Sequence, residues 1–139
     1  MTPRLIVDPS VALAWCFLDE ATPAARNLLE AAAKESILVP AWWYLEVANA
    51  LIVAERRGRI DAAKSGEFIA LVNSLSVEID TEGPDRAFDH LMPLCRAHQL
   101  TCYDAVYLDL ALRRQLPLAT LDEPLRKAAK KLRVRLLGR

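Results

Sequence analysis

Two carboxylates in this sequence stand where apolar segments end. Asp8 follows residues 4–7, which are predicted to form a short buried strand, and Asp122 lies just past a later apolar run at residues 116–120. In an open α/β sheet, ligands bind beyond the carboxyl ends of the strands, so these two side chains converge if the two strands are neighbours. Each acid also has an ordinary explanation, because Asp is common in turns and at helix starts.

A third carboxylate, Glu46, belongs to a helix predicted over residues 41–57. On this helix it shares a face with Trp42, Trp43 and Asn49, and no Lys or Arg lies on that face. A buried carboxylate without a partner is costly, and a metal ion would supply the missing positive charge. The alternative is that Glu46 lies at the edge of the apolar stripe and reaches water.

A fourth carboxylate, Asp104, falls in the first turn of a helix predicted over residues 101–115. Thr101 and Asp104 have the spacing of a capping-box variant, which by itself could explain the acid. The helix is apolar almost all round, so it should be central and carry Asp104 towards the core. Capping and metal binding are compatible, because both use the N-terminus of the helix.

Four converging carboxylates have a clear chemical use. Mg²⁺ and Mn²⁺ prefer oxygen ligands, and such an ion can activate water for an in-line displacement at phosphorus. Small hydroxyl and amide side chains nearby would orient the carboxylates. The sequence therefore predicts a divalent-metal site whose acids are Asp8, Glu46, Asp104 and Asp122, supported by Ser10, Asn49 and Thr120.

A zinc site is the main competing metal chemistry. Cys95, His98 and Cys102 offer three ligands at close spacing but no evident fourth, and Cys95 also fits an apolar helical stripe. The cysteines are odd in number and unclustered in sequence, so all three are expected to be reduced thiols. His90 and His98 are expected to be bystanders on a surface helix.

The composition suits one globular domain over residues 1–139. Apolar residues make up 53 % of the 139 residues and charged residues 26 %. The net charge is zero, but residues 124–139 carry seven basic residues and no acid, against 11 basic and 18 acidic residues before them. This stretch is either the solvated face of a terminal helix or a seat for a phosphate backbone, with Arg126, Lys127 and Lys130 as the candidate contacts.

Short apolar strands alternate with helices along the chain, and no repeat or internal linker interrupts them. This alternation predicts an α/β fold with a parallel sheet covered on both faces. No apolar run is long enough to cross a bilayer, and the start resembles no signal peptide, so a cytoplasmic location is expected. The predicted strands are residues 4–7, 37–39, 77–79, 116–120 and 134–137, and the predicted helices are 11–18, 23–35, 41–57, 61–75, one from Pro84 that Pro93 kinks, 101–115 and 124–132. The expected N-caps of the first, second and fourth of these helices are Ser10, Thr22 and Asp61.

These features together resemble the PIN-domain nucleases, and among them the VapC-type toxins of bacterial and archaeal toxin–antitoxin pairs. Each motif alone is weak, but the four occur in the family's order and spacing over essentially the whole chain. They are Ile6-Val7-Asp8-Pro9-Ser10-Val11, Tyr44-Leu45-Glu46-Val47-Ala48-Asn49-Ala50-Leu51, Thr101-Cys102-Tyr103-Asp104-Ala105-Val106-Tyr107 and Leu118-Ala119-Thr120-Leu121-Asp122.

The resemblance implies a three-layer α/β/α sandwich around a parallel sheet of four to five strands. It places the four acids on the family's acidic positions, and Ser10 and Thr120 on its hydroxyl positions. The implied activity is Mg²⁺- or Mn²⁺-dependent cleavage of RNA by metal-activated water, in a homodimer that a cognate antitoxin inhibits. Pro9 and the Trp42–Trp43 pair depart from the usual pattern, and neither removes a ligand.

Two other functions remain open at this point. The protein could be a PIN-domain nuclease of RNA processing or decay that has no antitoxin. It could also be a phosphate-accepting receiver module, a fold that clusters acids at strand ends. A receiver normally needs a pair of acids and a late Lys, whereas Asp8 stands alone and no Lys follows Thr120.

Overall fold

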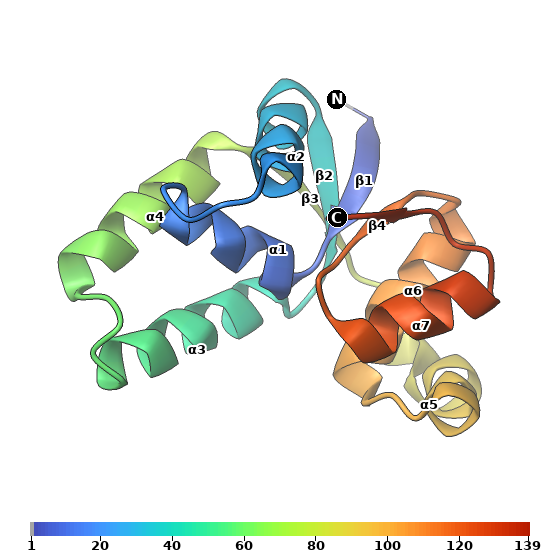
Figure 1. Cartoon of the computed structure of the whole chain (residues 1–139). Coiled ribbons are helices and arrows are strands. Elements are labelled where there is room, and N and C mark those ends of the chain that lie inside the picture. The colour runs from blue at the N-terminus through green and yellow to red at the C-terminus, as the bar shows by residue number, and fades with distance from the viewer. Residues whose placement is uncertain (1) are drawn as a thin grey trace.

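The computed structural model describes residues 2–139, whose apolar runs form a five-stranded, entirely parallel sheet (Figure 1). The strand order is β3-β2-β1-β4-β5, so β1 is the central strand. The predicted α/β class and parallel sheet are confirmed. The strands are β1 (Pro3–Val7), β2 (Ser36–Pro40), β3 (Ser76–Asp80), β4 (Leu118–Ala119) and β5 (Leu136–Leu137).

Helices cover the sheet on both sides, as Figure 1 shows. Four of them follow β1 and β2 in the chain and lie on one side; the other three follow β3 and β4 and lie on the opposite side. This arrangement is what right-handed crossovers require when the strand order runs outwards in both directions from β1. The first group is α1 (Pro9–Ala14), α2 (Pro23–Lys34), α3 (Trp43–Arg56) and α4 (Ala62–Ser74), and the second is α5 (Met92–His98), α6 (Cys102–Arg114) and α7 (Glu123–Lys131).

Local capping chemistry explains most helix ends. Thr22 and Asp61 accept hydrogen bonds from the first turns of α2 and α4, as their types predict. After α3, Gly58 has a φ of +70°, a left-handed conformation that glycine adopts without a steric penalty. One cap was wrongly predicted: Asp8, not Ser10, caps α1, because Pro9 opens the helix two residues earlier than expected.

The segment at residues 84–98 is less regular than the single kinked helix predicted there. It consists of the short helical turn η2 (Pro84–Arg86), the π-helical turn η3 (Ala87–Leu91) and then α5. Pro93 lies in the first turn of α5, where its missing N–H is not needed. A similar short turn, η1 (Trp15–Phe17), follows α1.

The core lies on both faces of β1, β2 and β4. The helix α6 is central, as predicted, because seven consecutive residues, 105–111, are buried. Trp15, Trp43 and Tyr107 are the largest side chains that are fully enclosed. No helix within residues 2–139 is long and apolar enough to cross a membrane.

Candidate metal centre

The strand order reverses between β1 and β4, and the four predicted acids belong to segments around this point. Asp8 directly follows β1, and its N–H donates to the carbonyl of Ala119 at the end of β4, 3.1 Å away. Asp122 lies three residues after β4. In open parallel sheets, the crevice beyond such a reversal is where ligands bind.

Asp8 is 4 % exposed and is held on both carboxylate oxygens. Its Oδ1 accepts from the Ser10 hydroxyl at 2.5 Å and from the Val11 N–H at 3.2 Å. Its Oδ2 accepts from the Thr120 hydroxyl at 2.6 Å. The two predicted hydroxyl residues therefore contact the predicted carboxylate, one from each side of the strand reversal.

The same two hydroxyls also hold the segment that carries Asp122. The Leu121 N–H donates to Ser10 Oγ at 2.9 Å, and the Asp122 N–H donates to Thr120 Oγ1 at 3.0 Å. Asp122 in turn caps α7, since its Oδ2 accepts from the Leu125 N–H at 3.0 Å. One oxygen of Asp122 is thus used in the cap and the other is left for the crevice.

Asp104 lies in the first turn of α6, where Thr101 is the N-cap. The Asp104 N–H donates to Thr101 Oγ1 at 3.2 Å. The carboxylate of Asp104 accepts no hydrogen bond from any residue in the range 2–139. The Thr101 hydroxyl lies near enough to lower the pKa of the Asp104 carboxyl slightly, so the cap accounts for Thr101 but gives the acid no strong partner.

Glu46 reaches the crevice from α3 and is half-buried. Its Oε1 accepts from the Tyr107 hydroxyl of α6 at 2.7 Å. The buried stripe of α3 runs through Trp43, Val47 and Leu51, so Glu46 lies at the edge of the stripe rather than inside it. The buried face of α3 differs from the predicted one because Trp43 and Val47 are the residues that pack against the core.

Asn49, which was predicted to support the acids, forms no hydrogen bond to them within residues 2–139. It is exposed, and it forms no side-chain hydrogen bond within the described part of the chain. The contact to Glu46 comes instead from Tyr107, which was not predicted to be a site residue. The signal for it was present, since Tyr107 is one helical turn from Asp104 on the same helix.

Electrostatic coupling shows that the four acids face one another. Burial raises the pKa of Asp8, and the nearby charge of Asp122 raises it further. The hydrogen bonds from Ser10 and Thr120 lower it, but by less than burial raises it. Burial also raises the pKa of Asp104, with further contributions from Asp122 and Asp8. For Glu46, burial is again the main cause of a raised pKa, followed by repulsion from Asp104 and Asp8 and opposed by the Tyr107 hydrogen bond. The crevice is therefore a site of concentrated negative charge.

Tyr107 stays a neutral phenol in this site. Burial raises its pKa far above the usual value, and the carboxylate of Glu46 raises it further. A neutral phenol donates its one proton to Glu46 Oε1 and so fixes the orientation of that carboxylate.

No cation of the protein neutralises this charge. Among residues 2–139, none of the four acids forms an ion pair with Lys, Arg or His. Elsewhere in the molecule the buried acids are paired: the carboxylate of Asp109 contacts Arg86 and Arg113, and that of Asp80 contacts Arg113. Burial alone would raise the pKa of Asp109, but the hydrogen bonds from Arg86 and Arg113 hold it below its usual value. Among the fully buried acids of residues 2–139, which are Asp8, Asp80 and Asp109, Asp8 is thus the one without a cationic partner.

This donor set fits a hard divalent cation. Carboxylate oxygens are the ligands that Mg²⁺ and Mn²⁺ prefer, and such ions keep several waters and need only one or two protein carboxylates. Across residues 2–139, no three His, Cys, Asp or Glu side chains already enclose a metal-sized position. Within the described residues, the acids therefore do not form a closed metal cage.

The zinc alternative has no closed ligand set. Cys95 Sγ and Cys102 Sγ lie 3.5 Å apart, and His98 does not join them in a cluster. The cysteines are unclustered in the sequence, but these two thiols are close together in the fold. The turn between α5 and α6 brings the pair together although seven positions separate them.

The basic C-terminal segment is only partly a solvated surface. Arg126 was predicted to point outwards, but it is 7 % exposed, and its Nη1 donates to the carbonyls of Thr120 and Leu137 at 2.7 and 3.0 Å. It therefore ties α7 to the ends of β4 and β5. Lys127 and Lys130 are exposed, as expected.

Comparison with known proteins is consistent with this architecture. The PIN domain family matches residues 5–131. The crystal structure of PAE2754 from Pyrobaculum aerophilum is similar over 92 % of this chain and 87 % of that one, with 25 % identity and a TM-score of 0.69. A toxin–antitoxin complex from Klebsiella pneumoniae contains a chain of the same fold, with 17 % identity, a TM-score of 0.51 and coverage of 85 % of this chain and 86 % of that one. No curated protein matches the sequence.

Proposed function

The chain belongs to the PIN domain family, whose members are generally nucleases, and on that premise we propose that it is a metal-dependent endoribonuclease. The observation that carries the proposal is the crevice itself: four carboxylates lie around the strand reversal, and within residues 2–139 no Lys, Arg or His pairs with them. In the proposed site, Mg²⁺ or Mn²⁺ is held by Asp8, Glu46, Asp104 and Asp122. When bound, the ion would lower the pKa of a water molecule and stabilise negative charge on the phosphate.

Different residues of the chain position the carboxylates of this site. Asp8 is fixed on both oxygens by Ser10 and Thr120, so it cannot rotate away. Glu46 is oriented by Tyr107 and keeps Oε2 free. The carboxylate of Asp104 is held only weakly, by the Thr101 hydroxyl, so it can adjust to the ion and to the substrate phosphate.

Cleavage of single-stranded RNA by the purified protein tests the proposal. We expect cleavage with Mg²⁺ or Mn²⁺ and none with EDTA. Asp104→Asn should abolish cleavage while circular dichroism shows an unchanged fold, and Asp19→Asn, at an exposed position, serves as the control that keeps full activity. If the Asp104→Asn protein cleaves RNA at the wild-type rate, the proposed mechanism is wrong.

We further propose that the enzyme is the toxin of a type II toxin–antitoxin pair, acting as a homodimer in the cytoplasm. The Klebsiella pneumoniae complex supports the fold alone, so the stronger support is a surface of this chain. An apolar groove of about 310 Å³ lies between α3 and α4. Leu45, Ile69 and Tyr44 line it and are 73 %, 48 % and 41 % exposed. A groove of this kind accepts the apolar face of a partner helix.

Co-expression with the small open reading frame beside this one tests the toxin role. We expect growth arrest by the chain alone and relief by its neighbour. Leu45→Glu should block the relief and leave RNA cleavage intact, whereas Phe88→Glu, which changes another exposed apolar residue outside the groove, should block neither. Harmless overexpression, with no such neighbour, would favour a nuclease of RNA processing. Sedimentation equilibrium tests the dimer.

A further inference from the structure

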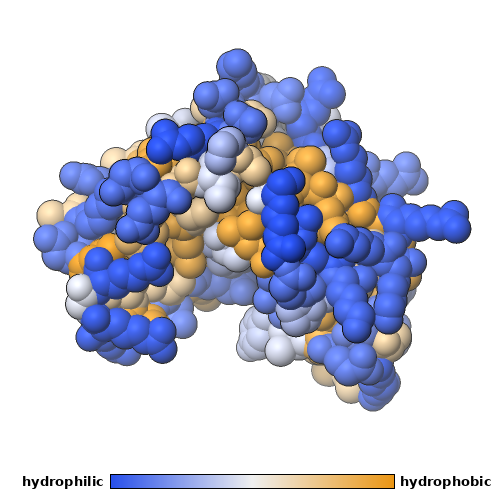
Figure 2. Space-filling view, viewed as in Figure 1, coloured by the Kyte–Doolittle hydropathy of each residue, from blue (hydrophilic) through white to orange (hydrophobic). Residues whose placement is uncertain are grey.

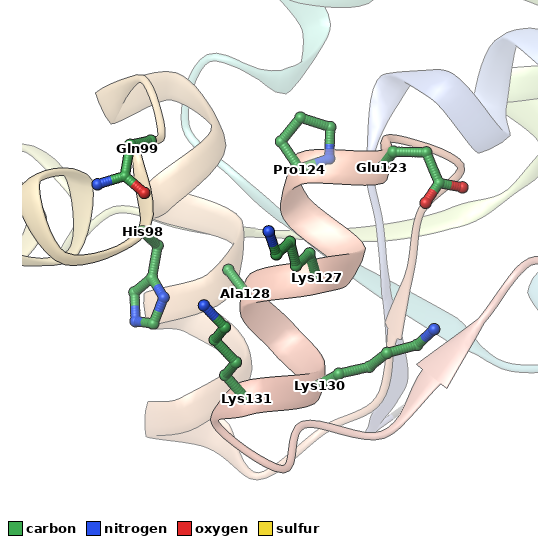
Figure 3. A pocket seen from close by; sticks show the side chains of 8 residues that line it. All are labelled: His98, Gln99, Glu123, Pro124, Lys127, Ala128, Lys130 and Lys131. Carbon is green, nitrogen blue, oxygen red and sulfur yellow. The ribbon is translucent and has the colours of Figure 1, made fainter.

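A second groove, basic rather than apolar, lies between the end of α5 and the outer face of α7 (Figure 3). Its volume is about 680 Å³. Figure 2 shows hydrophilic side chains over α7 on the right of the view. The residues that line the groove are His98, Gln99, Glu123, Pro124, Lys127, Ala128, Lys130 and Lys131.

This groove begins at the acid crevice. Glu123 and Pro124 directly follow Asp122, which caps the same helix. On the other wall, His98 and Gln99 precede Thr101, the residue that caps α6 beside Asp104. A chain molecule that leaves the acids along α7 therefore enters the groove.

The groove carries net positive charge. Lys127, Lys130 and Lys131 are exposed and form no ion pair within residues 2–139. Glu123 is the one acid in the lining, and it is paired with Arg139. In Figure 3, Lys127 and Lys131 point across the groove towards His98, while Glu123 and Lys130 point to the other side of α7.

We propose that Lys127 and Lys131, which lie opposite His98, bind backbone phosphates of an RNA strand. These phosphates are the neighbours of the phosphate that lies at the acids, and we call the pair of lysines the phosphate seat. This inference rests on the proposed RNase activity and adds the path of the substrate. Lys127 lies about 7.5 Å beyond Asp122 along the helix axis, and Lys131 about one turn further. A strand that passes the acids meets the two cations in succession. Contacts to phosphate position a strand but carry no sequence information, so the seat holds RNA of any sequence.

Helix stabilisation does not explain this arrangement. Lys130 and Lys131 fall in the last turn of α7, where cations interact favourably with the helix dipole. Lys127 stands in the middle of the helix, one turn before Lys131 on the same face, and gains nothing from the dipole. A ligand in the groove would account for its position.

Binding measurements test the seat separately from cleavage. The probe is a fluorescein-labelled single-stranded RNA, followed by anisotropy in EDTA, and every protein carries Asp104→Asn so that no cleavage occurs. The test variant is K127Q/K131Q. The matched control is R4Q/K34Q, which removes two unpaired exposed cations from the opposite, amino-terminal edge of the sheet.

The expected loss follows from counterion release. Each phosphate contact to a single strand contributes about 0.7 to the slope of log affinity against log salt. Two lost contacts should lower that slope by about 1.4 and weaken binding about 25-fold at 0.1 M salt. The control should change binding less than about twofold. Single-stranded DNA of the same sequence should show the same dependence on the two lysines, because the seat contacts phosphate.

The outcomes separate the two proposals. If K127Q/K131Q binds RNA as tightly as R4Q/K34Q with the same salt slope, the phosphate seat is wrong, whatever the enzyme cleaves. If the seat behaves as expected but wild-type protein leaves RNA intact with both metals, the RNase proposal fails and the binding site stands. Absence of any RNA binding by the parent protein would overturn the seat as well.

Discussion

Two acids on one helix should respond in opposite ways to the same isosteric change. Asp104 and Asp109 both belong to α6 and are five positions apart. The Asp109 side chain is 6 % exposed and accepts three hydrogen bonds, two from Arg86 at 2.7 and 2.9 Å and one from Arg113 at 3.1 Å. Asp104 accepts none from the described residues. Replacing each by Asn keeps the size of the side chain and removes its charge.

The magnitudes follow from these contacts. Asp109→Asn leaves two guanidinium groups beside an amide that cannot accept on both sides, and loss of one partner of a buried ion pair costs about 3–5 kcal/mol of unfolding free energy. Asp104→Asn removes a charge that burial disfavours and that Asp122 and Asp8 repel, as its raised pKa shows, and loses only the small stabilisation from the Thr101 hydroxyl. Its stability should stay within about 0.5 kcal/mol of wild type or exceed it.

Urea unfolding at pH 7 with EDTA measures both effects. With a slope of about 2 kcal/mol per molar urea, Asp109→Asn should lower the midpoint by about 2 M. Addition of Mn²⁺ at a hundred times its dissociation constant should then stabilise the wild type by about 2.7 kcal/mol and leave Asp104→Asn little changed. The reasoning is refuted if Asp104→Asn is destabilised as strongly as Asp109→Asn, because Asp104 would then have a structural partner.

Three further outcomes are expected. Tyr107→Phe removes the hydrogen bond that lowers the pKa of Glu46, so the acid limb of the rate–pH profile should move to higher pH, while stability falls by only about 1 kcal/mol. Asp8, Glu46 and Asp104 have folded pKa values above their unfolded values near 4, so their contribution to stability is full below those unfolded values and is lost as pH rises through the folded ones; urea midpoints in EDTA should therefore increase as the pH is lowered from 7 towards 4, and less so in Asp104→Asn. A mild oxidant such as diamide should join Cys95 to Cys102, two thiols 3.5 Å apart, with loss of two hydrogen atoms in the intact mass; an unchanged mass would mean that the α5–α6 turn cannot close.

The order of elements and most of their ends could be predicted from local signals. Proline at the first turn and Thr or Asp before it act within four residues, so they mark helix starts whatever surrounds them. Thr22 and Asp61 are such cases. The prediction failed at Ser10 because two capping residues competed, and the one preceding Pro9 prevailed.

The tertiary contacts could not be predicted in the same way. The pairing of Arg86 and Arg113 with Asp109, the burial of Arg126 and the approach of Cys95 to Cys102 all depend on which elements become neighbours. Helical periodicity placed Glu46 inside a stripe, whereas docking of α3 through its neighbours Trp43 and Val47 moved it to the edge.

The prediction that Asp8 and Asp122 lie at the same edge of the sheet rests on a topological rule. Strand ends of a parallel sheet meet at one edge, so Asp8 and Asp122 converge once β1 and β4 are adjacent. No local sequence pattern predicts the strand order itself. The resemblance to the PIN-domain nucleases took the place of that missing pattern, because it assigns the four weak motifs to one site.

The hydrogen bond from Thr120 to Asp8 also has a consequence during synthesis. It spans 112 positions of the chain, and β1 pairs with β4 in the same region. A nascent chain still on the ribosome with residues 118–122 inside the exit tunnel therefore lacks both the partner of Asp8 and the acid at position 122. Domains fold from their N-terminal parts as they emerge, but here the crevice closes only when one of the last strands is added. The crevice thus stays unassembled until residues 118–122 have left the exit tunnel, and any activity that it supports begins only after that point.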